Sequence, residues 1–141
     1  MSIAMTVLPP LPADEPRLVE AVQSHGGFVR AEDLIQTLRR RSSQPLSCVA
    51  RWIVQRDVVS VRRCDGWWLP RFQFSASEIA PLPIVRLVAE EFNDVLDEVE
   101  LVNWFFRPNA SLEGCLPACA IHDRADHVYR AARADRWVAR G

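Results

Sequence analysis

The sequence contains no lysine, a single tyrosine and no long hydrophobic run. All 17 basic residues are arginines, whose planar guanidinium groups favour bidentate recognition of phosphates and carboxylates where they converge. No apolar run approaches the roughly 18–20 residues that a transmembrane helix needs, so no membrane association is expected. The start of the chain lacks the basic segment of a secretory signal peptide. We therefore expect a cytoplasmic protein.

The cysteines do not form the pattern of a disulfide framework. Without a secretion signal, free buried thiols are expected for Cys48, Cys64, Cys115 and Cys119. Cys115, Cys119, His122 and His127 follow a C-x3-C-x2-H-x4-H pattern. Structural zinc sites place a loop of about a dozen residues between their two ligand pairs, so that the chain can fold back around the ion. Here only two residues separate the pairs, and neither a metal nor another cofactor is expected.

Motifs of the common catalytic classes are also missing. The chain has no P-loop, no nucleophile elbow and no dinucleotide fingerprint. Asp94, Asp97, Glu98 and Glu100 lie too close together in sequence for a positioned acid–base pair, and are expected to form a solvated face. The three histidines have no evident partner for nucleophilic catalysis. The chain is therefore expected to have no catalytic residues and not to be an enzyme.

The composition is that of a folded chain with an uneven distribution of charge. Its 141 residues are 49% hydrophobic and 25% charged, enough for one domain or two very small ones with a core of their own. Prolines near the start predict a flexible leader over residues 1–13. Residues 28–74 carry nine arginines against four acids (+5), residues 75–129 carry three against ten (−7), and residues 130–141 four against one (+3). Such blocks are explained either by solvated faces or by association with oppositely charged partners.

Residues 14–74 have the pattern of a helix-turn-helix followed by a β-hairpin. Apolar residues at helical spacing predict helices in "EPRLVEAVQS", "RAEDLIQTLRRR" and "PLSCVARWIVQ". In the third of these, the inward stripe is expected to be Leu46, Val49, Ala50 and Ile53. Asp65-Gly66 between β-forming residues is a strong hairpin signal. The expected fold is mostly α, with this unit followed by a small helical domain.

A helix-turn-helix of this kind suggests DNA binding. Gln44, Ser47, Arg51 and Gln55 are the candidates for reading base edges, because arginine pairs with guanine and glutamine with adenine. The candidates for phosphate contacts are Arg39, Arg40, Arg41, Arg62 and Arg63. A helical bundle that carries a hairpin and binds no DNA is the alternative.

The aromatic stretch "WWLPRFQF" at residues 67–74 is expected to join the two halves. Trp67, Trp68 and Leu69 form the second hairpin strand, and Pro70 ends the pairing because it has no N–H to donate. Phe72 and Phe74 point the same way in an extended chain. They are therefore expected to be buried and to anchor the front half onto the C-terminal helices.

After a linker at residues 75–83, three longer helices are expected within residues 84–141, and "SLEGCLPACAI" is expected to form a turn and then a short helix. The first runs from Ile84 to Leu96, with Ile84, Leu87, Val88, Phe92 and Leu96 inward. The second is "EVELVNWFF". Its last three aromatic residues diverge by about 100° each on a helix, so at least one is expected to face a partner. The third is "RADHVYRAARADRWVARG".

The segments "WFFRPNASLEGCLPACAI" and "ADHVYRAA" carry a family motif. Its residues are Trp104, Pro108-Asn109, Leu112, Gly114, Pro117, Asp126 and Ala131-Ala132. In this order and spacing they resemble the C-terminal domain of antitoxins of the Xre/MbcA/ParS class, over roughly residues 84–137. The upstream "LPRFQF" resembles the segment that joins a helix-turn-helix to this domain in one branch of that class.

The resemblance implies a type II antitoxin. Such a protein forms a homodimer, binds its own operator DNA and neutralises a cognate toxin, commonly of the NAD-consuming RES type, by covering its active site. The residues expected to contact the toxin are Trp104, Phe105, Arg107, Asn109, Gly114, Arg133, Arg136 and Trp137. The alternatives are a stand-alone helix-turn-helix transcriptional regulator and an interaction module without DNA binding.

Overall fold

The fold is mostly α-helical with one small antiparallel sheet, as the sequence predicts. The computed structural model describes residues 16–75 and 77–139, and the expected leader over residues 1–13 lies outside them. The elements of the front half are α1 (Pro16–Ser24), β1 (Phe28–Arg30), α2 (Ala31–Leu38), α3 (Pro45–Val54), β2 (Val61–Arg63), β3 (Gly66–Pro70) and the 3-10 helix η1 (Arg71–Gln73). Those of the second half are α4 (Pro83–Glu91), α5 (Glu98–Phe105), η2 (Ala110–Leu112), α6 (Pro117–Ala120) and α7 (Ala125–Ala139).

The hairpin predicted around Asp65-Gly66 is confirmed. β2 and β3 pair antiparallel with Arg63 opposite Gly66, and Gly66 has a φ of +122°, which favours glycine. A third strand, β1, pairs with the other side of β3, so the strand order is β1-β3-β2. The sequence did not predict β1, because three residues are too short to show an alternating pattern. Pro70 ends β3 but lies opposite Phe28 of β1, while pairing with β2 already ends at Trp68.

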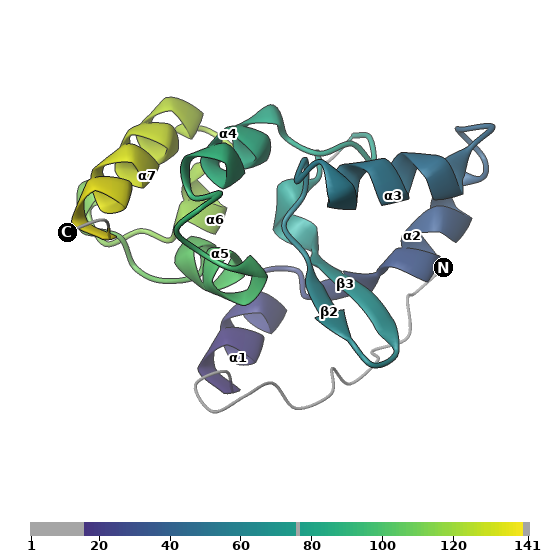
Figure 1. Cartoon of the computed structure of the whole chain (residues 1–141), viewed down its shortest axis with the longest axis horizontal. Helices are drawn as coiled ribbons and strands as arrows, with labels where there is room; N and C mark the ends of the chain where they lie inside the picture. Colours follow the sequence, from purple (N-terminus) through teal and green to yellow (C-terminus); the bar gives the residue numbers. More distant parts are fainter. Residues whose placement is uncertain (1–15, 76, 140–141) are drawn as a thin grey trace.

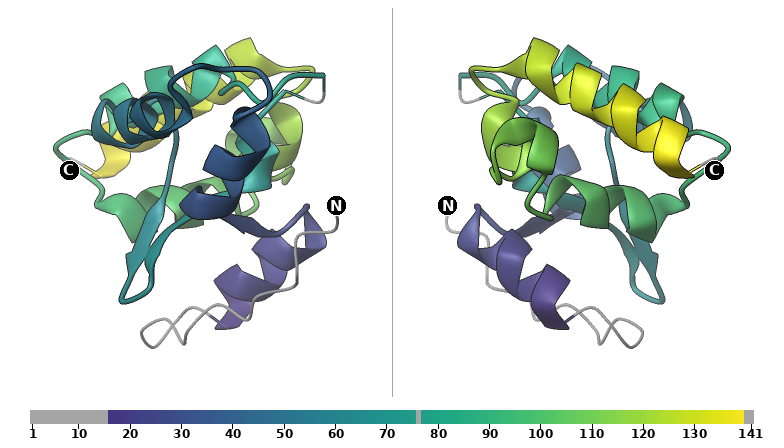
Figure 2. Two further views of the ribbon diagram at one scale, coloured as in Figure 1. Left: turned by 90° about the vertical axis from the view of Figure 1, so that its right-hand side faces the viewer. Right: turned by 90° about the vertical axis from the view of Figure 1, so that its left-hand side faces the viewer.

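The sheet lies between two groups of helices. Figures 1 and 2 show α2 and α3 on one side of the strands and α4 to α7 on the other, with α1 below α5. The strands contribute side chains to a hydrophobic cluster on each side. The smaller cluster belongs to the helix-turn-helix and consists of Val29, Leu34, Leu38, Val49, Trp52, Val58 and Leu69.

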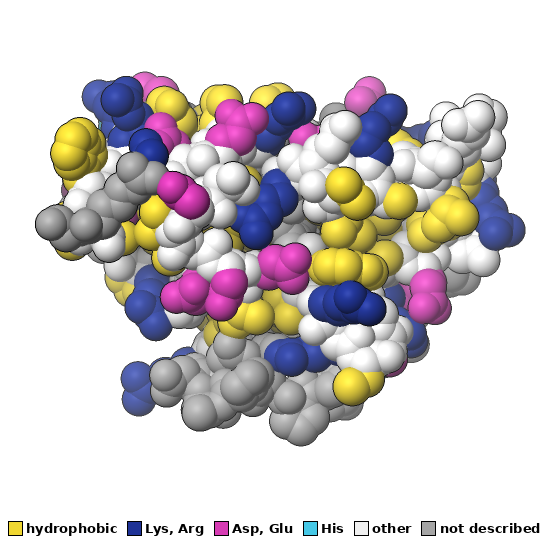
Figure 3. All heavy atoms as spheres, viewed as in Figure 1, with side chains coloured by type: hydrophobic (Ala, Val, Ile, Leu, Met, Phe, Trp, Pro, Cys, Tyr) yellow, Lys and Arg dark blue, Asp and Glu magenta, His cyan; other side chains and the backbone are white. Residues whose placement is uncertain are grey.

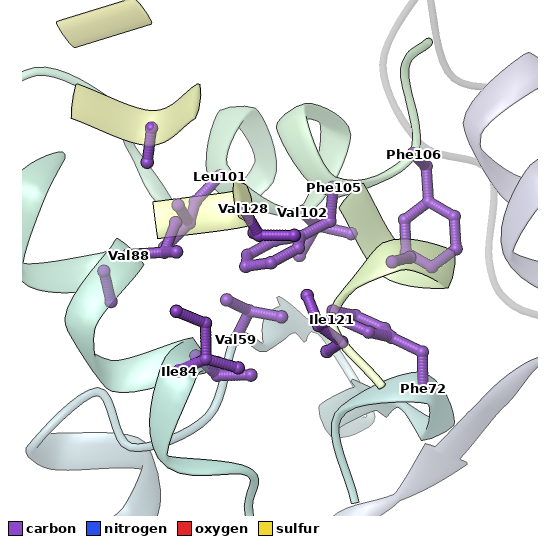
Figure 4. Close-up of a cluster of buried hydrophobic side chains, with 14 of the residues drawn as sticks. Val59, Phe72, Ile84, Val88, Leu101, Val102, Phe105, Phe106, Ile121 and Val128 are labelled. Carbon is purple, nitrogen blue, oxygen red and sulfur yellow. The ribbon is translucent and has the colours of Figure 1, made fainter. Parts of the chain in front are cut away.

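The larger cluster draws on both halves of the chain. Leu18 and Val22 of α1 and Val59 beside the sheet are buried together with Val88 of α4 and Phe105 of α5, and part of this packing is shown in Figure 4. Packing thus crosses the boundary expected between residues 14–74 and 84–141. α1, the first helix of residues 14–74, therefore packs in the larger cluster and not in the cluster of the helix-turn-helix.

Phe72 joins the halves as expected, but Phe74 does not point the same way. Phe72 packs between Phe105 and Phe106, with ring centroids 5.0 and 5.2 Å apart, and this contact is visible in Figure 4. Phe74 instead packs on Trp52 of α3, at 6.0 Å. The reason is the 3-10 turn η1, which breaks the two-residue alternation of an extended chain.

Gln73, between these two phenylalanines, is completely buried and fully hydrogen-bonded. Its Oε1 accepts a hydrogen bond from the Val59 N–H at 2.6 Å. Its Nε2 donates to the carbonyl oxygens of Val59 and Pro70, each at 2.9 Å. The side chain therefore serves the backbone of Val59 as a neighbouring strand would. Its burial costs little because every polar group has a partner.

The expected linker at residues 75–83 folds back on the preceding segment. Phe74 and Pro81 form an isolated β-bridge, and the Leu82 N–H donates to the Gln73 carbonyl at 2.8 Å. Leu82 is partly buried against the larger cluster. The segment thus brings the N-terminus of α4 next to η1.

Two helices differ from their predicted hydrophobic pattern. In α3, Val49 and Trp52 are buried, whereas Leu46 is 66% exposed and Ala50 is also exposed. The inward stripe therefore includes Trp52, and Leu46 and Ala50 lie outside it. In α4 the helix ends at Glu91, not at Leu96, and Leu87 is largely exposed while Val85 is buried.

The acidic stretch after α4 has a structural role in starting α5. Asp97 accepts a hydrogen bond from the Glu100 N–H at 2.8 Å, and Glu100 accepts one from the Asp97 N–H at 3.0 Å. This reciprocal pair is a capping box, which satisfies two of the backbone groups left free at a helix start. Among the described residues, no helix is long and apolar enough to cross a bilayer.

Candidate nucleic-acid and partner interfaces

The turn between α2 and α3 gathers the strongest positive charge of the front half. Arg39, Arg40 and Arg41 follow α2 directly and are all exposed. Arg51 of α3 and Arg62 of β2 are exposed as well. Within residues 16–75 and 77–139, none of these five guanidinium groups takes part in an ion pair. Their charge is therefore available to phosphate groups.

The residues expected to read base edges lie along α3. Gln44 precedes the helix, Ser47 and Arg51 lie on its exposed surface, and Gln55 follows its last residue. Gln44 and Gln55 are about 16 Å apart along the axis at 1.5 Å per residue. Because a recognition helix contacts bases with its N-terminal part, Gln44, Ser47 and Arg51 suit this role better than Gln55.

The outward face of α3 also carries apolar side chains. Leu46 is 66% and Val54 is 81% exposed, and with Ala50 they lie four residues apart on one stripe. Hydrophobic side chains are visible over α3 and towards the hairpin in Figure 3. Such groups can contact thymine methyls in a major groove, or the apolar surface of a protein partner.

The hairpin is held in place by its own aromatic residues. Trp68 donates from its indole nitrogen to Asp65 at 3.1 Å, and the Arg30 guanidinium lies over the Trp68 ring and donates to the Asp65 carbonyl at 3.0 Å. Arg62 stacks over Trp67 at 5.7 Å. Arg63, also expected at the DNA, is half-buried and engaged in an interaction. Arg62 therefore suits a phosphate contact better than Arg63.

In the second half, Asp135 of α7 accepts hydrogen bonds from two residues of the segment that resembles the antitoxin domain. The indole nitrogen of Trp104 donates to Asp135 Oδ2 at 2.7 Å, and the Asn109 amide donates to the same oxygen at 2.9 Å. Asn109 is buried, and its Oδ1 accepts from the Ser111 N–H. Trp104 and Asn109, expected to contact a toxin, thus position α7 from within.

Glu91 at the end of α4 forms a second connection to α7. Tyr129 donates to its carboxylate at 3.1 Å and Arg136 at 3.3 Å, and Arg133 lies within 3.8 Å. The side chain of Glu91 is only 14% exposed. Such partly buried ion pairs are screened less by salt than surface pairs. Arg133 and Arg136 therefore have an intramolecular role as ion-pair partners of Glu91, in addition to any contact with a partner.

Beyond these contacts, the C-terminal part of α7 is open to solvent. Trp137 is 78% and Val138 is 81% exposed, and Arg133 keeps most of its side chain exposed. Figure 3 shows hydrophobic and basic side chains together towards this end of α7. An exposed tryptophan beside arginines has the composition of a binding hot spot.

The other expected partner residues take different places. Phe105 is completely buried in the larger cluster and is a core residue, not a surface residue. Phe106 is buried as well, because α5 ends at Phe105 and Phe106 leaves the helical path, while Trp104 is partly buried against the same cluster. Arg107 is exposed near the Asn103 amide. Gly114 has a φ of +83° and donates its N–H to the Asn109 carbonyl, so its role is in the backbone turn.

The cysteines are more exposed than the sequence predicts. Cys64, Cys115 and Cys119 are exposed and Cys48 is half-buried, so the expectation of buried thiols is wrong. Among the described residues, no group of three or more potential ligands is arranged around one point. Desolvation, followed by the neighbouring Cys115, raises the pKa of the Cys119 thiol.

Sequence reasoning missed Asp135, Glu91 and Gln73. Asp135 and Glu91 look like ordinary surface acids, and only their distant partners give them a role. The one available signal for Gln73 was its position between two phenylalanines.

Comparison of the chain with family models, with curated proteins and with solved structures finds no match in any of the three.

Proposed function

We propose that this chain is a type II antitoxin that binds a toxin through α7 and its own operator through the helix-turn-helix. The observation that supports this best is the arrangement of the family-motif residues. Trp104 and Asn109 converge on Asp135 of α7, and Ala131 and Ala132 are buried in the core below it. The motif thus serves to position α7, and this helix presents an open surface at its C-terminal end.

The proposed toxin-binding surface consists of Arg133, Trp137 and Val138. Truncating Trp137 or Val138 should change the stability of the free protein little, because most of the surface of each side chain is exposed to water. Burying them against a partner would contribute apolar area, and Arg133 could meet an acidic group. In line with the resemblance, the proposed partner is a cytoplasmic toxin of the NAD-consuming RES type, bound by a homodimeric antitoxin across the toxin's active site.

The proposed DNA-binding surface consists of the turn after α2, the exposed side of α3 and Arg62 of the hairpin. Five exposed arginines without ion pairs to described residues supply the charge. Gln44, Ser47 and Arg51 are proposed to reach base edges. In this arrangement α2 crosses the backbone and α3 enters the major groove.

Co-expression with the product of the adjacent reading frame tests the toxin role. We expect that product to arrest growth alone, to be harmless together with this chain, and to co-purify with it. The proposal fails if the neighbour is harmless alone and no complex forms. Inhibition of NAD consumption by the purified complex would identify the toxin class.

Fluorescence-anisotropy titration against the upstream DNA tests the operator role. Binding is expected to weaken steeply as salt rises, because counterions are released from phosphates. A titration at two salt concentrations measures this directly. Absent binding at low salt, or binding indifferent to salt, would contradict the DNA-binding part of the proposal.

The second candidate is an interaction module without DNA binding. It is favoured by the apolar stripe on α3, where Leu46 and Val54 are exposed. Next to α3 lies an open apolar hollow of about 330 Å³ that includes Trp52, Leu82 and Leu87. If the anisotropy titration detects no DNA binding but the chain still forms a complex with a protein, this candidate replaces the proposal of a DNA-binding antitoxin.

A further inference from the structure

A hollow beside α2 has the composition of a binding site for a small organic anion. Its volume is about 290 Å³, just below the usual range of small-molecule sites, about 300–1,000 Å³. Four elements supply its apolar wall: Val29 from β1, Leu34 from α2, Phe74 after η1 and Ile79 from the following loop. None of these positions belongs to the proposed DNA or toxin surfaces.

The polar groups of the hollow are few. Thr37, Arg71 and Ser75 line it. The Thr37 hydroxyl donates to the Asp33 carbonyl, and the Ser75 hydroxyl accepts from the Glu78 N–H. Both hydroxyls are thus already engaged locally. The Arg71 side chain is exposed and makes no ion pair or side-chain hydrogen bond with a described residue.

Arg71 is held at the hollow by its backbone. Its N–H donates to the Gly27 carbonyl at 3.0 Å, at the start of η1. The exposed guanidinium is therefore available to a ligand at the mouth of the hollow. A guanidinium offers two parallel N–H donors to a carboxylate, and among the described residues no other cation lines the site.

We propose that this hollow binds a small monocarboxylate with an apolar body, such as a substituted benzoate or a medium-chain fatty acid. The apolar body would lie on Leu34 and Phe74, and the carboxylate would pair with Arg71. The proposal goes beyond the antitoxin function and does not depend on it. Because Phe74 packs on Trp52 of α3, the ligand would contact a side chain that is itself packed against the helix-turn-helix.

The test compares two ligands of the same shape, 4-ethylbenzoate and 4-ethylbenzamide. Calorimetric titration of the full chain is expected to show binding of the carboxylate about tenfold tighter than of the amide, the effect of one charge-assisted hydrogen bond. Amide chemical shifts in a parallel NMR titration should change around Leu34, Thr37 and Ile79. Equal affinity for both ligands, or no binding of either, would overturn the proposal.

Three variants sharpen the test. Arg71→Gln should remove the preference for the carboxylate, and Arg17→Gln on α1, also an exposed arginine, should leave it unchanged. Thr37→Leu adds apolar volume at the edge of the hollow from an exposed helix position, and should weaken both ligands. NMR spectra of the free variants show that each is folded. Carboxylate binding that survives in Arg71→Gln at full strength contradicts the assigned role.

Discussion

The indole nitrogen of Trp104 lies 2.7 Å from Oδ2 of Asp135, a residue 31 positions later, and the buried Asn109 amide shares that oxygen. One carboxylate therefore fixes the last helix both to α5, through Trp104, and to the turn after α5, through Asn109. This contact links two residues of the segment that resembles the antitoxin domain to the proposed toxin-binding surface.

Asp135→Ala removes the acceptor of both donors. Because the Asn109 amide then remains buried without this partner, we expect the free energy of unfolding to fall by about 1–3 kcal/mol, measured by urea denaturation. Asp126→Ala on the same helix is the control. Asp126 is exposed and pairs with Arg130, so its loss should lower the free energy of unfolding less than the loss of Asp135 does. Equal effects of the two substitutions would contradict the role of Asp135.

Gln73→Leu tests the buried amide. It leaves the N–H and carbonyl of Val59 without their side-chain partner, and a loss of at least about 2 kcal/mol is expected. Gln36→Leu on the exposed side of α2 is the matched change and should stay within about 0.5 kcal/mol of the parent. Urea midpoints compare the two, and a tolerated Gln73→Leu would show that solvent reaches Val59.

Phe72 and Phe74 should differ in their contributions to stability. Phe72→Ala opens a cavity between η1 and α5 and should cost about 3–5 kcal/mol. Phe74 is only partly buried, so Phe74→Ala should cost clearly less. Unfolding followed by tryptophan fluorescence and by circular dichroism measures both. An equal cost would mean that Phe74 also carries packing between the halves.

Trp137→Ala separates partner binding from folding. Because the side chain is 78% exposed, the melting temperature should stay unchanged, while affinity for the toxin falls by about 2 kcal/mol, as for a central tryptophan in an interface. Val54→Ala, a similarly exposed apolar residue on α3, should leave toxin binding intact. Unchanged affinity in Trp137→Ala would move the interface away from α7.

Arg40→Gln with Arg41→Gln tests the phosphate contacts. If both residues contact phosphates, the slope of log K against log salt should become shallower by about 2. The anisotropy titration in a salt series measures this slope. Arg130→Gln on α7, which removes one positive charge far from the proposed DNA surface, should leave it unchanged.

Individual helices and strands could be predicted from the sequence where a few neighbouring residues determine them. The Asp65-Gly66 hairpin and the start of α3 at Pro45 follow from turn chemistry and from proline at a first turn. The three-residue β1 has no such signal. Leu46 was placed inward because its spacing fits a helix, but the neighbouring elements select Trp52 in its place. Periodicity shows that a helix has an apolar face, and tertiary packing decides which face is buried.

The candidate sites could be predicted only in part for the same reason. Exposed arginines after α2 follow from three consecutive charges, which cannot all be buried. The inward roles of Trp104 and Asn109 depend on Asp135, which lies more than 25 residues away. No pattern in a single sequence encodes such a pairing, so residues of a motif that position a helix look the same as residues that touch a partner.

The placement of Phe72, Gln73 and Val59 across the junction also constrains how this chain could diversify. If recombination replaced everything before residues 75–83, Phe72 would be lost. The new N-terminal half would then need its own side chain to pack between Phe105 and Phe106. Such a replacement would also separate α1 from the helices that cover it. An exchange of the helix-turn-helix must therefore keep α1, Val59, Val61 and η1 together with the C-terminal helices.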